Sequence, residues 1–414
     1  MTQQVIASFS KEFATPQKTV EEMIEFIGEN VKPKDKVLIA LSGGVDSSTV
    51  TSLASRAIPN AIYPIFIDTG YMRIMNGRKE ADVIAEVFKD VPNLIVLDES
   101  ETFYNKTFGI KDGNEKRKAF RSTYDSVLNR EAKRLGCNIH MDGTIRPDIV
   151  ETKKGLKEQS NVGNVLLFEK KIEPLAPLYK HQVRKCAEAV GLPEEIAYRQ
   201  PFPGPGLSLR TVEEIGREKL EVERKANDIV ERGVERFFKE TYGKPFLYDE
   251  LTGERIPFQY FAVTLDNSLQ SKNKDEREIE RYVKSLTKKD TMAVTLENKS
   301  TGVAYKGEEM ERIYTPVLAL HIDGEVSSLI LTHLGKVIPQ KFGYSRVIHE
   351  IQNGNGKFFV SIQNIKSLNA VTSESIVNLP AYRNIAGEIR EKCSGVGAVF
   401  QDISSKPPAT IEYE

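Results

Sequence analysis

Two periods of hydrophobic residues alternate along the first half of the chain. Short apolar runs predict strands, and they occupy residues 35–42, 61–70, 93–100 and 137–144. The run at 35–42 is continuous, which predicts a strand buried on both faces. Around them, apolar residues recur at helical spacing and predict amphipathic helices, at residues 19–31, 48–58, 78–91 and 118–136. The alternation predicts an α/β fold with a doubly wound parallel sheet, whose ligand site lies at the carboxyl ends of the strands.

The pattern changes after "RQPFPGPGLSLR", residues 199–210, because its prolines and glycines exclude a helix or a central strand. We therefore predict one domain at residues 1–210 and a second at 211–414. The second domain begins with a helical segment and continues with strands that look antiparallel, an α+β pattern. A charged, helical insertion is expected at residues 266–297.

The C-terminal region also carries a faint internal similarity. The segment "YSRVIHEI" (344–351) resembles "VGAVFQDI" (396–403), and each follows a helical segment. We therefore predict two small αβ units in tandem, at residues 298–352 and 356–414.

The composition is that of an ordinary globular protein. Lys and Arg number 58 against 59 Asp and Glu, a formal net charge of −1, which argues against nucleic-acid binding. No apolar run of about 18 residues occurs, so we expect no membrane span, and the N-terminal segment does not have the pattern of a signal peptide. Cys137, Cys186 and Cys393 form no C-x-x-C pair, which is typical of reduced thiols in a cytoplasmic protein.

The strongest chemical signal is "SGGVDSS", residues 42–48, between a predicted strand and a predicted helix. Glycines let the backbone approach a ligand, and the N–H groups at a helix N-terminus attract anions. No lysine follows the turn, in contrast to the loop G-x-x-x-x-G-K-[ST]. The turn therefore suits the β- and γ-phosphates of a nucleotide, and the carboxylate of Asp46 suits Mg²⁺.

This stretch resembles the pyrophosphate loop of the N-type ATP pyrophosphatases. Further segments narrow the resemblance to GMP synthase: "NEKRK" (114–118), "GTIRPDIVE" (143–151), "RQPFPGPGLSLR" (199–210) and "DISSKPPATIEYE" (402–414). The similarity covers most of residues 20–262, is patchy from 263 to 395, and is strong again from 396. It implies an adenine-nucleotide alpha-hydrolase-like sheet followed by a C-terminal α+β dimerisation region that also binds XMP.

The resemblance implies a ligase that uses ATP and Mg²⁺ and acts in two steps. The C2 oxygen of XMP attacks the α-phosphate of ATP and gives adenyl-XMP and pyrophosphate, and ammonia then displaces AMP to give GMP. Adenylation turns a poor leaving oxygen into a good one, so the task of the protein is mostly positioning and charge neutralisation.

The same resemblance implies roles for individual residues. Pyrophosphate and Mg²⁺ are expected at Ser42, Gly43, Gly44, Val45, Asp46, Ser47 and Ser48, and the adenosine beside Asp68 and Gly70. Catalytic roles are expected for Asp46, for the acidic pair Asp148 and Glu151, for Lys157 in a lid over residues 150–165, and for Lys180. XMP is expected to contact Arg117, Lys406, Ile411 and Glu412.

The chain departs from the family pattern at several positions, and each change alters charge or the capacity for proton transfer. Gln159 and Ser160 replace the two lid histidines, and Gln200 replaces a histidine before the prolines. His181 and Gln182 replace an acidic pair, and Gln363 replaces an arginine. A related ligase that adenylates and aminates a different nucleotide or nucleobase therefore stays open, as does a catalytically weakened regulatory paralogue.

The cysteine pattern bears on the source of nitrogen. Glutaminases of this family carry a nucleophilic cysteine in G-x-C-x-G, and none of the cysteines here lies in such a sequence. We therefore expect free ammonia or a separate glutaminase subunit.

The C-terminal region has strand edges to bury and no catalytic motif before the tail, which predicts a homodimer.

Overall fold

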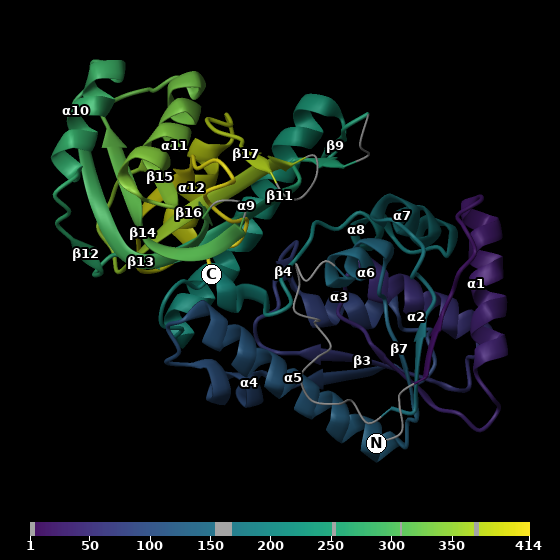
Figure 1. Cartoon of the computed structure of the whole chain (residues 1–414). Coiled ribbons are helices and arrows are strands. Elements are labelled where there is room, and N and C mark those ends of the chain that lie inside the picture. The colour runs from purple at the N-terminus through teal and green to yellow at the C-terminus, as the bar shows by residue number, and fades with distance from the viewer. Residues whose placement is uncertain (1–4, 154–167, 251–253, 307–308, 368–371) are drawn as a thin grey trace. The chain divides into compact units, whose positions relative to one another are not determined.

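The computed structural model describes residues 5–153, 168–250, 254–306, 309–367 and 372–414 (Figure 1). The chain forms two compact units. The first unit comprises Met1–Met72, Arg78–Lys106 and Lys118–Phe202, and the second comprises Arg73–Gly77, Thr107–Arg117 and Pro203–Glu414. The chain thus passes into the second unit between Phe202 and Pro203, within the proline-rich segment, and two short stretches from the N-terminal half also belong to the second unit.

The first unit is built on a parallel sheet of six strands in the order β1-β8-β7-β2-β3-β6. The strands are β1 (Val5–Ser8), β2 (Val37–Ala40), β3 (Ile62–Asp68), β6 (Ile95–Asp98), β7 (Ile139–Met141) and β8 (Lys170–Glu173). The predicted parallel sheet is confirmed, and β2, β3, β6 and β7 lie within the predicted apolar runs. The sequence did not reveal β1 and β8, because β1 is short and largely exposed and β8, "KKIE", is half polar.

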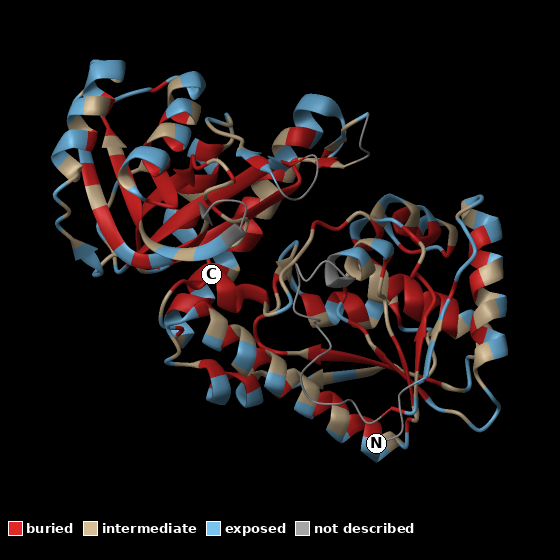
Figure 2. Cartoon of the chain, viewed as in Figure 1, coloured by how far each residue is buried: buried red, intermediate tan, exposed pale blue. Residues whose placement is uncertain are grey.

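Helices pack against this sheet. They are α1 (Pro16–Asn30), α2 (Val45–Ala57), α3 (Glu80–Val87), α4 (Ser100–Thr107), α5 (Gly113–Leu135), α6 (Arg146–Lys153), α7 (Lys180–Ala189) and α8 (Glu194–Ala197). Helix α1 shows why the sequence forms them. The Thr15 side chain accepts a hydrogen bond from the N–H of Lys18 and caps the helix, and Val20, Met23 and Ile27 recur at helical spacing and are buried (Figure 2). Helices α1, α2 and α7 pack against one another.

The second unit is built on a mixed sheet in the order β11-β16-β18-β15-β14-β13-β12, with β17 paired to β16. Its strands are β11 (Gln259–Asp266), β12 (Gln270–Ser271), β13 (Thr291–Lys306), β14 (Glu309–Ile322), β15 (Arg346–Gln352), β16 (Phe358–Ser367), β17 (Ser373–Ser375) and β18 (Val396–Asp402). The strands were expected to be antiparallel, but β14 pairs with β15 and β16 with β18 in parallel. Each of these pairs is joined by a crossover helix, which is what a parallel connection requires.

The helices of the second unit are α9 (Arg217–Tyr242), α10 (Glu276–Thr287), α11 (Ser328–Phe342) and α12 (Tyr382–Lys392). Short elements complete the unit: β4 (Ile74–Met75), η1 (Gly206–Leu209), β9 (Leu247–Tyr248) and β10 (Arg255–Ile256). Strand β5 (Arg78–Lys79) lies in the first unit.

Helices α9 and α12 share one apolar cluster with β11, β16 and β18, and α10 and α11 share another with β13, β14 and β15. Successive side chains along a strand point to opposite faces of the sheet. The residues that alternate with the members of these two clusters form a third apolar cluster on the opposite face. All four helices therefore cover the same face of the sheet.

The predicted insertion at 266–297 contains β12 and α10 and enters β13. Ile279 and Val283 anchor α10 to the sheet, while its remaining surface is mostly charged. Among the helices in the described ranges, none is both long enough and apolar enough to cross a membrane.

Candidate functional site

The loop Ser42–Gly44 joins β2 to α2 and exposes backbone N–H groups at the start of α2. Gly44 is the N-cap residue, and no side chain caps the helix there. The Ser47 hydroxyl accepts a hydrogen bond from the N–H of Ser42 at 3.1 Å and donates to the carbonyl oxygen of Gly44 at 3.2 Å. The loop is therefore held in shape by its own hydroxyls, and the helix N-terminus it presents is suited to an anion.

Gly43 is required by its backbone and by its neighbours. Its φ is +74°, and a Cβ there would lie 2.8 Å from the Arg199 guanidinium and 2.9 Å from a Glu80 carboxylate oxygen. Arg199 donates a hydrogen bond to the carbonyl oxygen of Gly43 and forms an ion pair with Glu80, and both side chains are buried. Arg199 and Glu80 thus support the loop, a role that the sequence did not reveal. The only signal was the place of Arg199 in the proline-rich family segment.

Asp46, in the first turn of α2, contacts Lys180, the first residue of α7. Lys180 Nζ lies 2.6 Å from Asp46 Oδ2, and both side chains are about one-third exposed. Among the described residues, no group hydrogen-bonds to the buried Asp46 Oδ1 or to the buried hydroxyl of Ser48. The structure therefore brings together two of the predicted catalytic residues and leaves oxygen atoms of the loop available to a ligand.

The adjacent strand end packs tightly on this loop. Gly143 follows β7, and a Cβ there would lie 3.0 Å from Asp46 Cβ and 3.1 Å from the backbone nitrogen of Ser47. Next to it, Lys171 on β8 lies 3.0 Å from Asp142 and 2.8 Å from Glu173, and these attractions raise its pKa against the opposing effect of burial. This charged group was not expected from the sequence, because β8 was not predicted.

The other predicted residues of the first unit have structural partners of their own. Asp68 Oδ1 accepts a hydrogen bond from the N–H of Gly70 at 2.9 Å, and the Gly70 carbonyl oxygen accepts one from the Tyr104 hydroxyl at 2.9 Å. Asp148 Oδ2 accepts a hydrogen bond from the N–H of Ile145 at 3.2 Å, at the start of α6. The lid residues, Lys157 included, lie outside the described residues, and the side chain of Glu151 is not described either.

In the second unit, the C-terminal tail is enclosed by charged residues. Lys116 forms a buried ion pair with the side chain of Glu414, and Arg117 donates to the carbonyl oxygen of Glu414. The N–H of Glu213 donates to Glu414 Oε1 at 2.7 Å. Burial raises the pKa of Glu414 to about 7, against the effect of Lys116, and lowers the pKa of Lys116.

The tail residue Glu412 is held by Arg210 in a two-point contact. Arg210 Nε and one terminal nitrogen lie 3.1 and 3.0 Å from the two carboxylate oxygens of Glu412, a geometry that favours strong, directional pairing. The Arg210 guanidinium also stacks 3.7 Å from the centre of the Phe261 ring. Ile411 packs on the apolar cluster of the same sheet face. Arg210 was not identified from the sequence.

Lys406 is buried near Asp402 and Arg346. Burial lowers the pKa of Lys406 to about 8, although the Asp402 carboxylate acts in the opposite direction. Asp402 itself has a lowered pKa, because Lys406 and Arg346 outweigh the effect of its burial. Within the described parts of the chain, no cluster of His, Cys, Asp and Glu has the arrangement of a metal site made by protein ligands alone.

Comparison with known proteins relates this chain to one family. No protein-family model matches it. The B subunit of GMP synthase (glutamine-hydrolyzing) from Saccharolobus solfataricus is 35% identical over 406 residues, which cover 94% of this chain and 98% of that protein. The protein of the same name from Sulfurisphaera tokodaii is 33% identical over 412 residues, which cover 96% of this chain and 99% of that protein.

The protein of this name from Methanosarcina acetivorans is 46% identical over 253 residues, which are 60% of this chain and 75% of that protein, so that protein is the shorter of the two. The resemblance found in the sequence is confirmed by relatives that align along almost the whole chain. The chain belongs to the family of GMP synthase B subunits.

Proposed function

We propose that this chain catalyses the ATP-dependent amination of XMP to GMP through an adenyl-XMP intermediate, with release of AMP and pyrophosphate. The observation that carries the proposal is the loop of residues 42–48. It presents a helix N-terminus, Gly43 in a left-handed conformation and the Asp46–Lys180 pair. These features occur in a chain that is 35% identical to a GMP synthase B subunit along nearly its full length.

The chemistry assigns the loop to the departing pyrophosphate. The C2 oxygen of XMP forms a bond to the α-phosphorus of ATP, and the bond from that phosphorus to the β-phosphate oxygen breaks. Negative charge grows on the pyrophosphate, and the N–H groups of the loop and the Lys180 ammonium stabilise it. Ammonia then forms a bond to C2, a proton is lost, and AMP leaves with the oxygen.

The loop also fits Mg²⁺. Asp46 is a hard oxygen ligand, and its buried Oδ1 has no hydrogen-bond partner among the described residues, while Oδ2 is held by Lys180. Mg²⁺ favours one or two carboxylates together with phosphate oxygens. Asp46 would therefore hold the ion, which neutralises phosphate charge when bound.

We further propose that the second unit recognises XMP. Arg117 and Lys406 supply positive charge and Glu412 a carboxylate, as the family resemblance implies, and Arg210 keeps the carboxylate of Glu412 in a fixed orientation. Bidentate pairing of this kind transmits geometric specificity. Arg210 is thus a positioning residue in this proposal.

The ammonia is proposed to come from a separate glutaminase subunit, since the relatives are named as the B subunit of a glutamine-hydrolyzing enzyme. Location in the cytoplasm and assembly as a homodimer stay predictions.

Two of the family departures bear on this proposal. The N–H of Tyr179 donates to Gln182 Oε1 at 2.8 Å, so Gln182 caps helix α7, which carries Lys180. Gln363 lies buried in β16, where the family has an arginine. The loss of that positive charge favours a second candidate function, the adenylation and amination of a different nucleotide.

The test is the release of pyrophosphate and AMP by the purified chain with MgATP. XMP would be supplied with and without ammonium, with IMP and other oxopurine nucleotides in parallel, and Asp46→Asn would serve as the inactive control. GMP formation that depends on ammonium and XMP supports the proposal. Pyrophosphate release with another nucleotide but not with XMP would replace it by the second candidate.

A further inference from the structure

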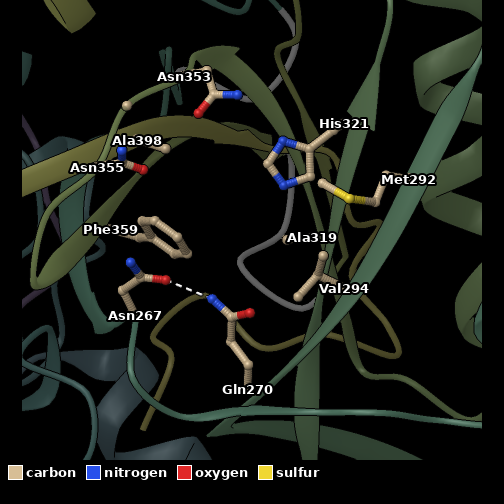
Figure 3. A pocket seen from close by; sticks show the side chains of 11 residues that line it. Asn267, Gln270, Met292, Val294, Ala319, His321, Asn353, Asn355, Phe359 and Ala398 are labelled. Atoms are coloured by element: carbon tan, nitrogen blue, oxygen red, sulfur yellow. Dashed lines mark hydrogen bonds between the residues drawn. The ribbon is translucent and has the colours of Figure 1, made fainter.

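A cavity of about 210 Å³ lies in the second unit, at the end of the sheet where β14 and β15 finish and β13, β16 and β18 begin (Figure 3). Its floor contains Ala319, Phe359 and Ala398, which belong to the apolar cluster on the face opposite the helices. Among the described residues that line it, none comes from the C-terminal tail, residues 402–414. The cavity is therefore distinct from the tail residues that are proposed to bind XMP.

Small side chains create this hollow. Ala319 and Ala398 are buried and carry only a methyl group, whereas Val317 and Phe400, the neighbours on the same face of the same two strands, are larger. The floor is therefore low at the two alanines. Figure 3 shows the ring of Phe359 at one side of the hollow.

The wall formed by the loop between β15 and β16 is held in place by backbone contacts. Asn267 Nδ2 donates a hydrogen bond to the carbonyl oxygen of Gly356 at 2.8 Å, and Arg390 donates to the carbonyl oxygen of Asn353 at 2.8 Å. A Cβ at Gly354 would lie 2.8 Å from a backbone oxygen of β18, so the loop packs directly on that strand. The cavity is thus formed without a ligand, which lowers the cost of ordering on binding.

The rim of the cavity is polar and rich in carboxamides, which are those of Asn267, Gln270, Asn353 and Asn355. Gln270 Nε2 donates to Asn267 Oδ1 at 2.6 Å, as Figure 3 shows. A carboxamide carries both donors and an acceptor, so it can pair with a ligand edge that carries one of each. Among the eleven described residues that line the cavity, none is Lys, Arg, Asp or Glu.

His321 completes the rim, and its ring is fixed by two neighbours. His321 Nδ1 lies 2.5 Å from Glu350 Oε2, and the ring lies edge-on to Phe400 with 5.7 Å between the ring centres. Phe400 packs in the same way on Phe359, at 5.3 Å. With Nδ1 directed at Glu350, Nε2 is the ring nitrogen left to meet a ligand.

We infer that this cavity binds a nucleobase, either as the free base or as the base of a nucleoside. Bases stack on aromatic side chains, here Phe359, and their edges pair with carboxamides. The volume equals that of about seven water molecules at about 30 Å³ each, which suits one heterocycle and not a whole nucleotide. The inference does not rest on the proposed function.

Other classes of small ligand fit this lining less well. A phosphate or a carboxylate would meet no lysine or arginine among the described lining residues, and a buried charge needs a partner. A sugar carries hydroxyl groups on its faces as well as on its edge, and the apolar floor would leave those hydroxyls without hydrogen bonds. A planar ligand that is apolar on its faces and polar on its edge matches both the floor and the rim.

The first test is calorimetric titration of the full chain with hypoxanthine and adenine, with inosine and adenosine, and with ribose. We expect the two bases to bind with a Kd below about 1 mM and ribose not to bind. Equal affinity for the nucleosides would place the ribose outside the cavity, and binding of the bases alone would identify the free base as the ligand. No binding of either base up to about 3 mM, or binding of ribose as tight as that of the bases, would overturn the inference.

The second test locates the bound base with variants. Ala319→Leu fills the floor and should weaken binding of the bases at least about tenfold. Arg210→Lys, which alters the tail, should bind them as the parent chain does. Loss of base binding in Arg210→Lys but not in Ala319→Leu would place the base at the tail and overturn the inference, whatever nucleotide the enzyme uses.

A milder variant covers the case in which Ala319→Leu, checked by its melting curve, does not fold. Asn355→Ala removes one exposed carboxamide of the rim and should weaken base binding about three- to tenfold. Asn105→Ala, at an exposed asparagine of α4 in the first unit, is the matched control and should leave binding unchanged. Equal affinities of these two variants for the bases would contradict recognition at the rim.

Discussion

Lys180 Nζ lies 2.6 Å from Asp46 Oδ2, although the two residues are 134 positions apart in the sequence. Asp46 is in the first turn of α2 and Lys180 is the first residue of α7. The pair therefore places a positive charge and an oxygen ligand at one end of the phosphate loop, where the N-terminus of α2 already favours anions.

Replacement of Lys180 by Met is expected to lower the rate of pyrophosphate release about 100-fold, because a charged donor to the departing phosphates is lost. Lys185→Met is the matched control, since Lys185 lies on the same helix and pairs with the surface residue Glu188. The measurement is a steady-state pyrophosphate assay with both variants. A Lys180→Met rate within about twofold of the parent would exclude Lys180 from the reaction.

Gly43→Ala is expected to destabilise the first unit and to raise the KM for ATP. The left-handed backbone costs a residue with a Cβ about 1 kcal/mol or more, and the added methyl group collides with Arg199 and Glu80. Gly28→Ala is the control, because Gly28 lies in α1 and nothing lies within 4 Å of the position that a Cβ would occupy there. Its substitution should raise helix stability by up to about 1 kcal/mol. Thermal melts measure the stability of both variants, and ATP titrations measure their KM for ATP. Equal melting temperatures and equal KM values in the two variants would contradict the role of Gly43 in the loop.

Arg210→Lys is expected to raise the KM for XMP at least about tenfold and to leave the KM for ATP unchanged. Lysine keeps the charge but loses the two-point contact with Glu412 and the stacking on Phe261. Arg224→Lys is the control, since Arg224 pairs with the exposed Glu221 on α9. Initial rates at varied XMP and ATP distinguish the two constants. A rise in the KM for ATP as well as in the KM for XMP would indicate a general loss of structure.

Lys406 predicts a pH dependence of stability. Its pKa in the folded chain is about 8, below the ordinary value of 10.5, because of burial. Between these values the unfolded chain binds more protons than the folded one, so the contribution of Lys406 to stability rises with pH and is lost as the pH falls through about 8. Lys406→Met should abolish this rise, whereas Lys336→Met, at a half-exposed lysine, should keep it. Melting temperatures from about pH 7 to 10 test this, and parallel curves for the parent and Lys406→Met would contradict it.

Much of the fold was readable from short segments of sequence. The apolar runs that became β2 and β3 are nearly continuous, and a strand buried on both faces is recognised from such a run. Strand β6 also lay in an apolar run, but it is at the edge of the sheet and Val96 is 40% exposed. The loop of residues 42–48 was equally readable, because its glycines, hydroxyls and Asp46 act through backbone geometry and chemistry within a few residues. The proline-rich segment and the tail carried the family resemblance in the same local way.

Other features depended on contacts between distant residues. Strands β1 and β8 have no strong pattern of their own and are stabilised by the sheet that they join. Arg199 and Glu80 support Gly43, and Arg210 holds Glu412 of the C-terminal tail. These contacts join residues that no periodic signal connects.

The internal similarity of the C-terminal region lies between these two cases. The segments "YSRVIHEI" (344–351) and "VGAVFQDI" (396–403) are similar in the sequence, yet similarities over so few residues are common by chance, so the sequence alone predicted only two αβ units. The tertiary structure decided that the strands in these segments are antiparallel neighbours, with His349 paired to Gln401, because strand register is a long-range property that no short segment specifies by itself.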